Sequence, residues 1–277
     1  MSAGVSRADR AVSDERAVSG DGAPRMAVHR RGSGPDLIMF HGGMGSWKHW
    51  VRNIEPLAGR FTVHALDHPS YGASASVPHE TTGAEYLDLV HALFVEMFPG
   101  AAPLRFAGFS FGAAIATNLA RRLAPRVTHL CLVSPAGFPT RKFGERPTRS
   151  YREAGDDEKL FREICRHNLL VNMLSDPAAI SDETLDIQAE CVRRTRFNSR
   201  KVSGGGTLLG DLGELQCRIR VLWGDRDDSA FRPADLLIGE IRMAVRGPLD
   251  VHRVPNAGHW SAYENAAEVN RLMLEFF

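Results

Sequence analysis

The sequence predicts an α/β protein with a mostly parallel, doubly wound sheet and a helical lid insertion. Short apolar segments alternate with longer helical patterns from about Met26 onward, and this alternation stops between about 137 and 216. The apolar segments are nearly continuous, which is typical of parallel strands that helices cover on both faces. A chain of 277 residues is long enough for one elaborated domain of this kind.

Composition and charge favour a small-molecule substrate. The 34 Lys and Arg residues nearly balance the 33 Asp and Glu residues, so the formal net charge is +1. Such a balance argues against nucleic acid or an anionic membrane as the main partner, and no apolar run reaches the roughly 20 residues that a membrane span needs. A homo-oligomer is compatible with this sequence.

The four cysteines are scattered and form no C-x-x-C pair, which favours reduced thiols in a cytoplasmic protein. Residues 1–24 are rich in Ser, Gly, Ala and Arg and lack the apolar core of a signal peptide. We expect this segment to be a disordered tail.

The predicted core occupies residues 25–136 and 217–277. Its expected strands are Leu37 to Phe40, Phe61 to Leu66, Leu104 to Phe109, His129 to Val133, Arg218 to Trp223 and Asp250 to Val254. Its expected helices are Ala84 to Phe98, Ala113 to Leu123, Pro233 to Val245 and Ala266 to Phe277. The predicted lid, residues 137–216, has helices near Asp157 to Leu174 and Asp182 to Thr195. An insertion at this point would cover the carboxyl ends of the strands, where such sheets bind ligands.

The pentapeptide Gly108 to Gly112, G-F-S-F-G, places a serine between a predicted strand and a predicted helix. In this setting the chain turns sharply and exposes the serine hydroxyl, and glycines flank the serine because the turn leaves no room for side chains. Ser110 is therefore the predicted nucleophile. A serine that only caps the following helix is the alternative.

A serine hydroxyl reacts only when a base takes its proton, and a carboxylate must orient that base. His259 lies between the last predicted strand and the last helix, and three aspartates follow the preceding strand. The G-x-x-D spacing from Gly224 favours Asp227 as the acid, with Asp225 structuring the turn and Asp228 in solvent. The chain order Ser, Asp, His is one of the known orders of a catalytic triad.

The segment His41 to Ser46, H-G-G-M-G-S, directly follows the first predicted strand. We expect the backbone N–H groups of Gly43 and Phe111 to form an oxyanion hole. A plain glycine turn is the alternative, while a phosphate-binding loop is disfavoured because no G-K-[ST] follows these glycines.

Taken in order, the motifs resemble the α/β-hydrolase superfamily over about Met26 to Phe277. They are H-G-G, D-H-P-S-Y-G-A-S from Asp67 to Ser74, G-F-S-F-G, W-G-D-R-D and G-H-W. Within the superfamily the chain is most similar to the meta-cleavage-product hydrolases, which break carbon–carbon bonds in vinylogous diketone acids from aromatic degradation. The resemblance implies the α/β-hydrolase fold.

The resemblance also implies two substrate-binding residues. The segment Trp47 to Ile54 is similar to the family's W-x-x-x-x-R-N-I, whose asparagine lies at the active site and corresponds to Asn53. Trp260 matches the tryptophan of the family's G-H-W.

At two other positions the sequence differs from the family's pattern. Phe109 stands where the family has an asparagine before the nucleophile, and Gln188 aligns with the lid arginine that holds the substrate's carboxylate. Arg193 and Arg194 follow closely, and bidentate arginine contacts would suit a carboxylate. The alternative is that they belong to a solvated basic face of a lid helix.

We therefore expect a serine hydrolase that needs no metal or other cofactor and acts on a small, partly apolar, carboxylate-bearing molecule. Its reaction is carbon–carbon bond hydrolysis or, alternatively, that of a carboxylesterase, lactonase or amidase. A non-catalytic small-molecule-binding protein is a third hypothesis, but it would have no need of Asp227. A dehalogenase is disfavoured because its nucleophile would be a carboxylate, and position 110 is serine.

Overall fold

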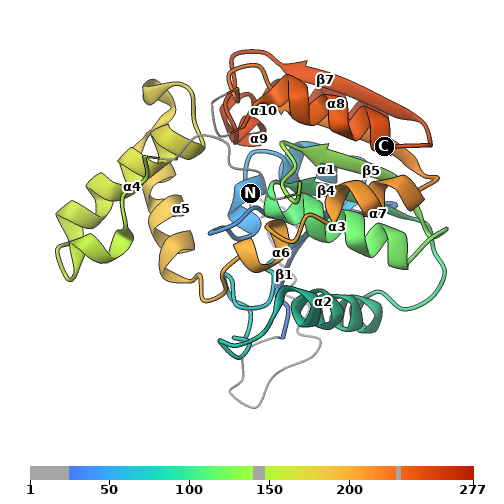
Figure 1. The fold of residues 1–277 in the computed structure, drawn as a ribbon, viewed down its shortest axis with the longest axis horizontal. Coiled ribbons are helices and arrows are strands. Elements are labelled where there is room, and N and C mark those ends of the chain that lie inside the picture. Colours follow the sequence, from blue (N-terminus) through green and yellow to red (C-terminus); the bar gives the residue numbers. More distant parts are fainter. Residues whose placement is uncertain (1–24, 140–146, 229–231) are drawn as a thin grey trace, which may run out of the picture.

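The computed structural model describes residues 25–139, 147–228 and 232–277, and its centre is a seven-stranded sheet with helices on both faces (Figure 1). The strand order is β1-β3-β2-β4-β5-β6-β7, and all neighbours are parallel except β1 and β3. The strands are β1 (Val28–Arg31), β2 (Asp36–Phe40), β3 (Thr62–Leu66), β4 (Leu104–Phe109), β5 (Val127–Val133), β6 (Arg218–Gly224) and β7 (Leu249–Val254). The predicted fold class is confirmed. The tail predicted over residues 1–24 lies outside the described residues.

Each strand expected from the sequence is present, and β1 is an additional one. Its four residues, V-H-R-R, carry little apolar signal because β1 is an edge strand that pairs only with β3, in antiparallel register. The central strands β2 to β4 are almost wholly buried, which explains why their apolar runs are continuous.

Helices cover the two faces of the sheet. One apolar core lies beneath α2, α3, α7 and α8, and a second lies beneath α1, α9 and α10. The helices of the core are α1 (Ile54–Ala58), α2 (Gly83–Met97), α3 (Phe111–Arg122), α7 (Leu208–Glu214), α8 (Ala234–Ala244), α9 (Ser261–Glu264) and α10 (Ala266–Phe276). A short 3-10 helix, η1 (Trp47–Trp50), follows the loop after β2.

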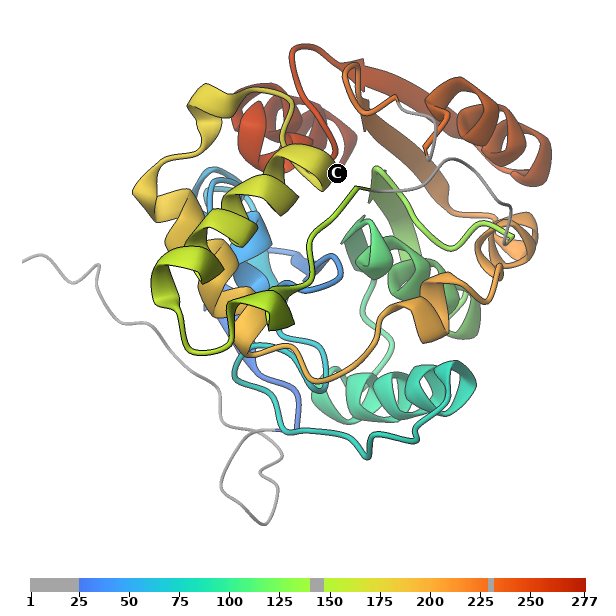
Figure 2. The same ribbon diagram turned by 60° about the vertical axis from the view of Figure 1, so that its left-hand side comes forward.

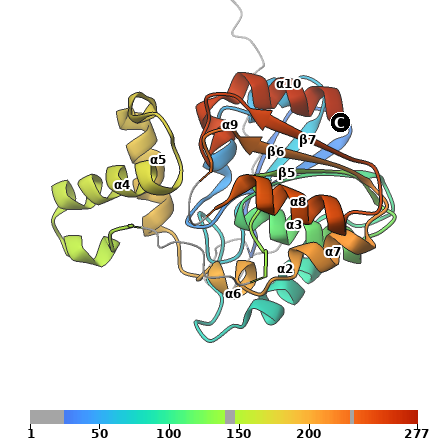
Figure 3. The same cartoon turned by 45° about the horizontal axis from the view of Figure 1, so that its top comes forward.

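The inserted segment forms a helical unit beside the sheet (Figures 2 and 3). Asp157 caps α4 (Glu158–Asn172) by accepting the N–H of Leu160, and Ser181 forms a capping box at the start of α5 (Asp182–Arg193). The shorter elements of this unit are η2 (Tyr151–Ala154) and η3 (Pro177–Ala179). The next helix, α6 (Arg200–Ser203), packs on α2 and α3, with Val202 buried in the core of the sheet.

The expected end of the lid at residue 216 needs a correction. Helix α7 lies against α3, with Leu208 and Leu212 buried in the core of the sheet. Asp211 on α7 accepts hydrogen bonds from Asn118 and Arg121 on α3. This helix therefore belongs to the core, and its seven residues, L-L-G-D-L-G-E, are too few and contain too many glycines to show a helical pattern in the sequence.

No helix in residues 25–139, 147–228 or 232–277 combines the length and apolarity that a membrane crossing requires.

Candidate active site

Ser110 occupies a strained turn between β4 and α3. Its φ of 50° and ψ of −114° lie outside the ordinary regions for a non-glycine residue. A Cβ at Gly108 would lie 2.7 Å from the Cα of Ala113, and one at Gly112 would lie 2.3 Å from the carbonyl oxygen of Phe40. Both neighbours are backbone atoms, so the turn needs glycine at both positions and lifts the Ser110 hydroxyl away from the strand.

The three residues predicted to form a triad lie together in a hydrogen-bonded chain. Ser110 Oγ lies 3.0 Å from His259 Nε2, and His259 Nδ1 lies 2.8 Å from Asp227 Oδ2. Asp227 and His259 are buried, and the ring of Phe109 packs against the imidazole. Burial raises the pKa of Asp227, but its contacts with His259 and with Arg232 outweigh this effect, and the pKa is lowered overall. The acid is therefore ionised at neutral pH.

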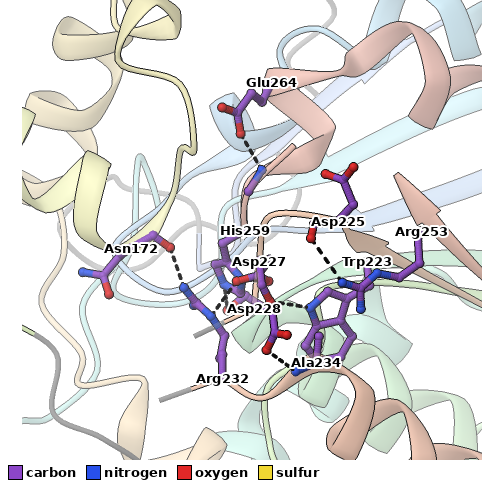
Figure 4. Close-up of polar contacts among 12 residues, drawn as sticks. Asn172, Trp223, Asp225, Asp227, Asp228, Arg232, Ala234, Arg253, His259 and Glu264 are labelled. Carbon is purple, nitrogen blue, oxygen red and sulfur yellow. Dashed lines mark hydrogen bonds and ion pairs between the residues drawn. The ribbon is translucent and has the colours of Figure 1, made fainter. Parts of the chain in front are cut away.

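The three aspartates after β6 differ in their exposure and in their hydrogen-bond partners. Asp227 alone faces His259, and its backbone carbonyl accepts the indole N–H of Trp223 at 3.0 Å (Figure 4). Asp225 is exposed and accepts the N–H of Ala257, so it joins the β6 loop to the loop that carries His259. Asp228 is also exposed, and it accepts the N–H of Ala234 at the start of α8.

The loop after β2 lies beside the turn at Ser110. A Cβ built at Gly43 would lie 3.9 Å from the Cβ of Phe111, so the two residues expected to donate to an oxyanion are adjacent. Phe111 is the first residue of α3, where backbone N–H groups have no partner within the helix. The same Cβ would lie 2.7 Å from the hydroxyl of Ser199, a residue of the inserted unit that the sequence did not single out.

Three buried histidines, His41, His49 and His68, form hydrogen bonds with the backbone of this loop or with one another. His41 Nδ1 donates to the carbonyl of Gly42 at 2.7 Å, and its Nε2 accepts the N–H of His68 at 3.1 Å. His49 Nδ1 accepts the N–H of Gly42 at 3.2 Å. Burial lowers the pKa of His41 to about 3 and holds the pKa values of His49 and His68 well below the ordinary range. All three are therefore neutral at the pH at which His259 would act.

A cavity of about 320 Å³ opens next to His259. Its walls are the end of α4 and residues 173–175, the β6 loop with Asp227 and Arg232, and Gly258 beside the imidazole. Ser110 is not part of this wall, so the cavity adjoins the His259 side of the hydrogen-bonded chain. The inserted unit thus forms one wall of the site.

Residues 172–176, which we name the lid base, are bonded to the loop that carries His259. The N–H of Trp260 donates to the carbonyl of Met173 at 2.7 Å. Glu264 Oε1 accepts the N–H and hydroxyl of Ser175, each at 2.8 Å, while Oε2 accepts the N–H of Gly258 at 2.6 Å. Sequence motifs do not identify Glu264, because a carboxylate in a short helix four residues after Trp260 matches none of them.

Two residues expected to contact the substrate, Asn53 and Trp260, are fully buried. Asn53 is fully buried, and its amide donates to Asn270 on α10 at 2.8 Å. Trp260 is also fully buried, stacks on Tyr263 and donates its indole N–H to the carbonyl of His49 at 2.8 Å. Both side chains are enclosed by protein and stabilise the packing of α1, η1 and α9, and their contact with a substrate stays a prediction.

The two lid arginines are engaged by glutamates of the lid. Arg193 pairs with Glu158 and packs over the ring of Phe161, and Arg194 lies 3.6 Å from Glu190. Both side chains are about half exposed, and neither belongs to the wall of the cavity beside His259. This arrangement favours the solvated basic face that was the alternative interpretation.

The geometry supports proton transfer and attack on a carbonyl. A hydroxyl in a strained turn, a base within 3.0 Å and a buried carboxylate form the arrangement that activates a serine. The adjacent residues Gly43 and Phe111 each carry a backbone N–H, the kind of group that stabilises negative charge on a carbonyl oxygen.

Comparisons with known proteins also indicate a hydrolase. Residues 37–272 match the family described as "Alpha/beta hydrolase family". The chain is 29% identical over 271 residues to 2-hydroxy-6-oxo-6-phenylhexa-2,4-dienoate hydrolase of Burkholderia cepacia, with 91% of each chain covered.

Two solved structures show the same fold. A meta-cleavage product hydrolase from Pseudomonas fluorescens IP01 matches with a TM-score of 0.70 and 20% identity, over 91% of this chain and 93% of that one. The carboxylesterase CesB from Bacillus subtilis matches with a TM-score of 0.71 and 20% identity, over 95% of this chain and 91% of that one.

Proposed function

Because the chain belongs to the alpha/beta hydrolase family, we propose that it is a serine hydrolase whose triad is Ser110, His259 and Asp227. The observation that carries the proposal is the hydrogen-bonded chain from Ser110 through His259 to the buried carboxylate of Asp227. His259 accepts the Ser110 proton as the hydroxyl attacks a carbonyl carbon, or takes it from a water that does so. Asp227 fixes the imidazole with Nε2 free to accept that proton.

The proposed oxyanion donors complete this mechanism. As the carbonyl carbon becomes tetrahedral, the N–H groups of Gly43 and Phe111 bind its oxygen. When His259 returns the proton to the leaving group, that group departs, and water then attacks in the same geometry. In this scheme each step uses only groups of the chain and water.

For the substrate, we propose a small, partly apolar, carboxylate-bearing molecule and hydrolysis of a carbon–carbon bond in a meta-cleavage-type product. This rests on the relatives, which include the Burkholderia enzyme and a 2-hydroxy-6-oxononadienedioate/2-hydroxy-6-oxononatrienedioate hydrolase of Comamonas testosteroni. A cytoplasmic location remains a prediction from the cysteine pattern.

A carboxylesterase, lactonase or amidase is the second candidate. It is favoured by Phe109, whose fully buried ring replaces the polar residue that the resembling family has before its nucleophile. Because Arg193 and Arg194 are paired within the lid, they do not by themselves supply a carboxylate site. The esterase therefore differs from the first candidate in needing no anion clamp.

The test compares wild type with Ser110→Ala on two substrates, a dienone carboxylate of the meta-cleavage type and a para-nitrophenyl ester. Fast decay of the dienone absorbance that depends on Ser110 would establish the first candidate. Turnover of the ester alone would establish the second. If Ser110→Ala retained full turnover of both, or if a fluorophosphonate failed to label Ser110, the proposal would be wrong.

A further inference from the structure

Arg232 is a largely buried cation beside the proposed triad. Its side chain is 12% exposed, its Nε lies 2.7 Å from Asp227 Oδ1, and its Nη2 donates to the carbonyl oxygen of Asn172 at 2.9 Å (Figure 4). Burial lowers the pKa of Arg232 and the Asp227 carboxylate raises it, but a guanidinium keeps its charge at any pH near neutrality. The proposed mechanism does not require this residue.

Asp227 is consequently shared between two partners. Its Oδ2 faces Nδ1 of His259, and its Oδ1 faces the guanidinium of Arg232. When a carboxylate pairs only with an imidazole, its negative charge favours the protonated form of that imidazole. A fixed cation on the other oxygen reduces the net negative charge that His259 meets, so it opposes uptake of a second proton by the ring.

Other charged or titratable groups around His259 do not duplicate this cation. Arg226 and Asp228 lie on the same loop but are exposed, and Arg226 donates to Asn256. Glu264, from α9, directs its oxygens to backbone N–H groups and the Ser175 hydroxyl. His49, from η1, is neutral because burial holds its pKa well below the ordinary range. Among the described charged groups near His259, Asp227 and Arg232 form a largely buried ion pair.

Arg232 also connects the acid to the inserted unit. Asn172 is the last residue of α4, and the carbonyls at a helix end lack partners within the helix and carry partial negative charge. Arg232 binds the first residue of the lid base, whereas Trp260 and Glu264 bind its later residues. The lid base thus bridges the loop of the acid and the loop of the base.

We propose that Arg232 is a positioning residue that limits proton uptake by His259 and couples this effect to the seating of the lid base. The inference rests on the proposed function, since it assigns a role relative to the triad. Its consequence is that His259 stays neutral, and able to act as a base, at lower pH than an Asp–His pair alone would allow.

The test measures the pH dependence of two reactions of the full chain. These are inactivation by a fluorophosphonate, in which Ser110 Oγ bonds to phosphorus as fluoride leaves and His259 takes the proton, and hydrolysis of para-nitrophenyl acetate. In Arg232→Met the midpoint of the acid limb should move up by about one pH unit, as expected for loss of a nearby like charge. Arg226→Met is the matched control, because it removes an arginine from the same loop and cavity wall but not from the ion pair. Its midpoint should stay at the wild-type value.

Arg232→Lys is the second variant and keeps the proposal testable if Arg232→Met does not fold. It retains the charge but loses the forked guanidinium, so it should keep the wild-type midpoint while the amides of the lid base exchange faster with deuterium. A folded Arg232→Met that loses rate equally at all pH values, with its midpoint unchanged, would reduce Arg232 to a structural role. A midpoint that moved as far in Arg232→Lys as in Arg232→Met would also overturn the proposal.

Failure of the proposed function would look different. In that case wild type and Ser110→Ala would react alike with the fluorophosphonate, whatever residue stood at position 232.

Discussion

Glu264 accepts the backbone N–H of Gly258 at 2.6 Å, and Gly258 is the residue immediately before the proposed base. The other oxygen of the same carboxylate holds Ser175 in the lid base. One side chain therefore fixes the loop of His259 and the wall of the cavity at the same time.

Replacing Glu264 by Gln should destabilise the fold by about 1 to 3 kcal/mol, because an amide NH2 would face backbone donors that lose their acceptor. The specificity constant kcat/KM should fall as well, because the loop that carries His259 loses its hydrogen bond to Glu264. Urea unfolding and ester hydrolysis measure the two effects. Glu268, whose side chain is partly exposed and pairs with Arg271 on α10, provides the control: Glu268→Gln should change stability by less than about 1 kcal/mol. Equal effects of the two variants would contradict the role of Glu264.

Asp227→Asn should lower kcat by about 10⁴-fold, because an amide favours the wrong imidazole tautomer. It should also lower the free energy of unfolding by about 3 kcal/mol, since the buried Arg232 loses its counter-charge. Both effects are measured on one purified variant. Asp228→Asn serves as the control, because Asp228 is exposed and an asparagine oxygen can still accept the N–H of Ala234. A stable but inactive Asp227→Asn would show that Arg232 finds another partner.

Gly112→Ala should destabilise the protein by about 3 kcal/mol, because the new methyl group would overlap the carbonyl oxygens of Phe40 and His41, which belong to β2 and its loop. Thermal unfolding followed by circular dichroism measures the loss. Gly239→Ala, in the middle of α8, meets no atom within 4 Å and should be neutral or stabilising by up to about 1 kcal/mol. A Gly112→Ala protein of wild-type stability would mean that the turn at Ser110 has more room than the structure shows.

Because Asp67 is buried, we expect the free energy of unfolding to depend on pH in a specific way. Burial raises the pKa of Asp67 to about 6, although the N–H groups of Ala73 and Trp47 stabilise its charged form. The folded state therefore holds this proton more tightly than the unfolded chain does. The stabilising contribution is complete below the unfolded pKa of about 4 and is lost as the pH rises through about 6, to an extent of about 3 kcal/mol.

Asp67→Asn should flatten the stability curve across that interval, which urea unfolding at a series of pH values will measure. Asp227, whose pKa is lowered, contributes its own slope only at more acidic pH, so the two effects are separable. The exposed Asp88→Asn is the control and should leave the slope unchanged. A wild-type slope in Asp67→Asn would show that another group titrates there.

The sequence predicted the central strands and the turn at Ser110 because local rules determine both. The bounds of β4 match the expectation, and the glycines around Ser110 are required by backbone contacts that any such turn produces. The assignment of Asp227 among three aspartates followed from turn spacing, and the structure places that carboxylate alone against His259.

The sequence could not predict contacts that depend on backbone atoms brought together from distant segments. Arg232 binds the carbonyl of Asn172, which lies sixty residues away in the chain. The sequence motif also did not show that Asn53 hydrogen-bonds to Asn270, or Trp260 to the carbonyl of His49, because both partners come from distant segments.

Strands β1 and β7 terminate the sheet, and both carry charged residues, V-H-R-R in β1 and L-D-V-H-R-V in β7. An unpaired strand edge is a template on which a second chain can add its own strand. Charged side chains on an edge strand oppose such an addition, because a second strand would have to pair beside them. The charges of β1 and β7 therefore discourage growth of the sheet from one molecule into the next.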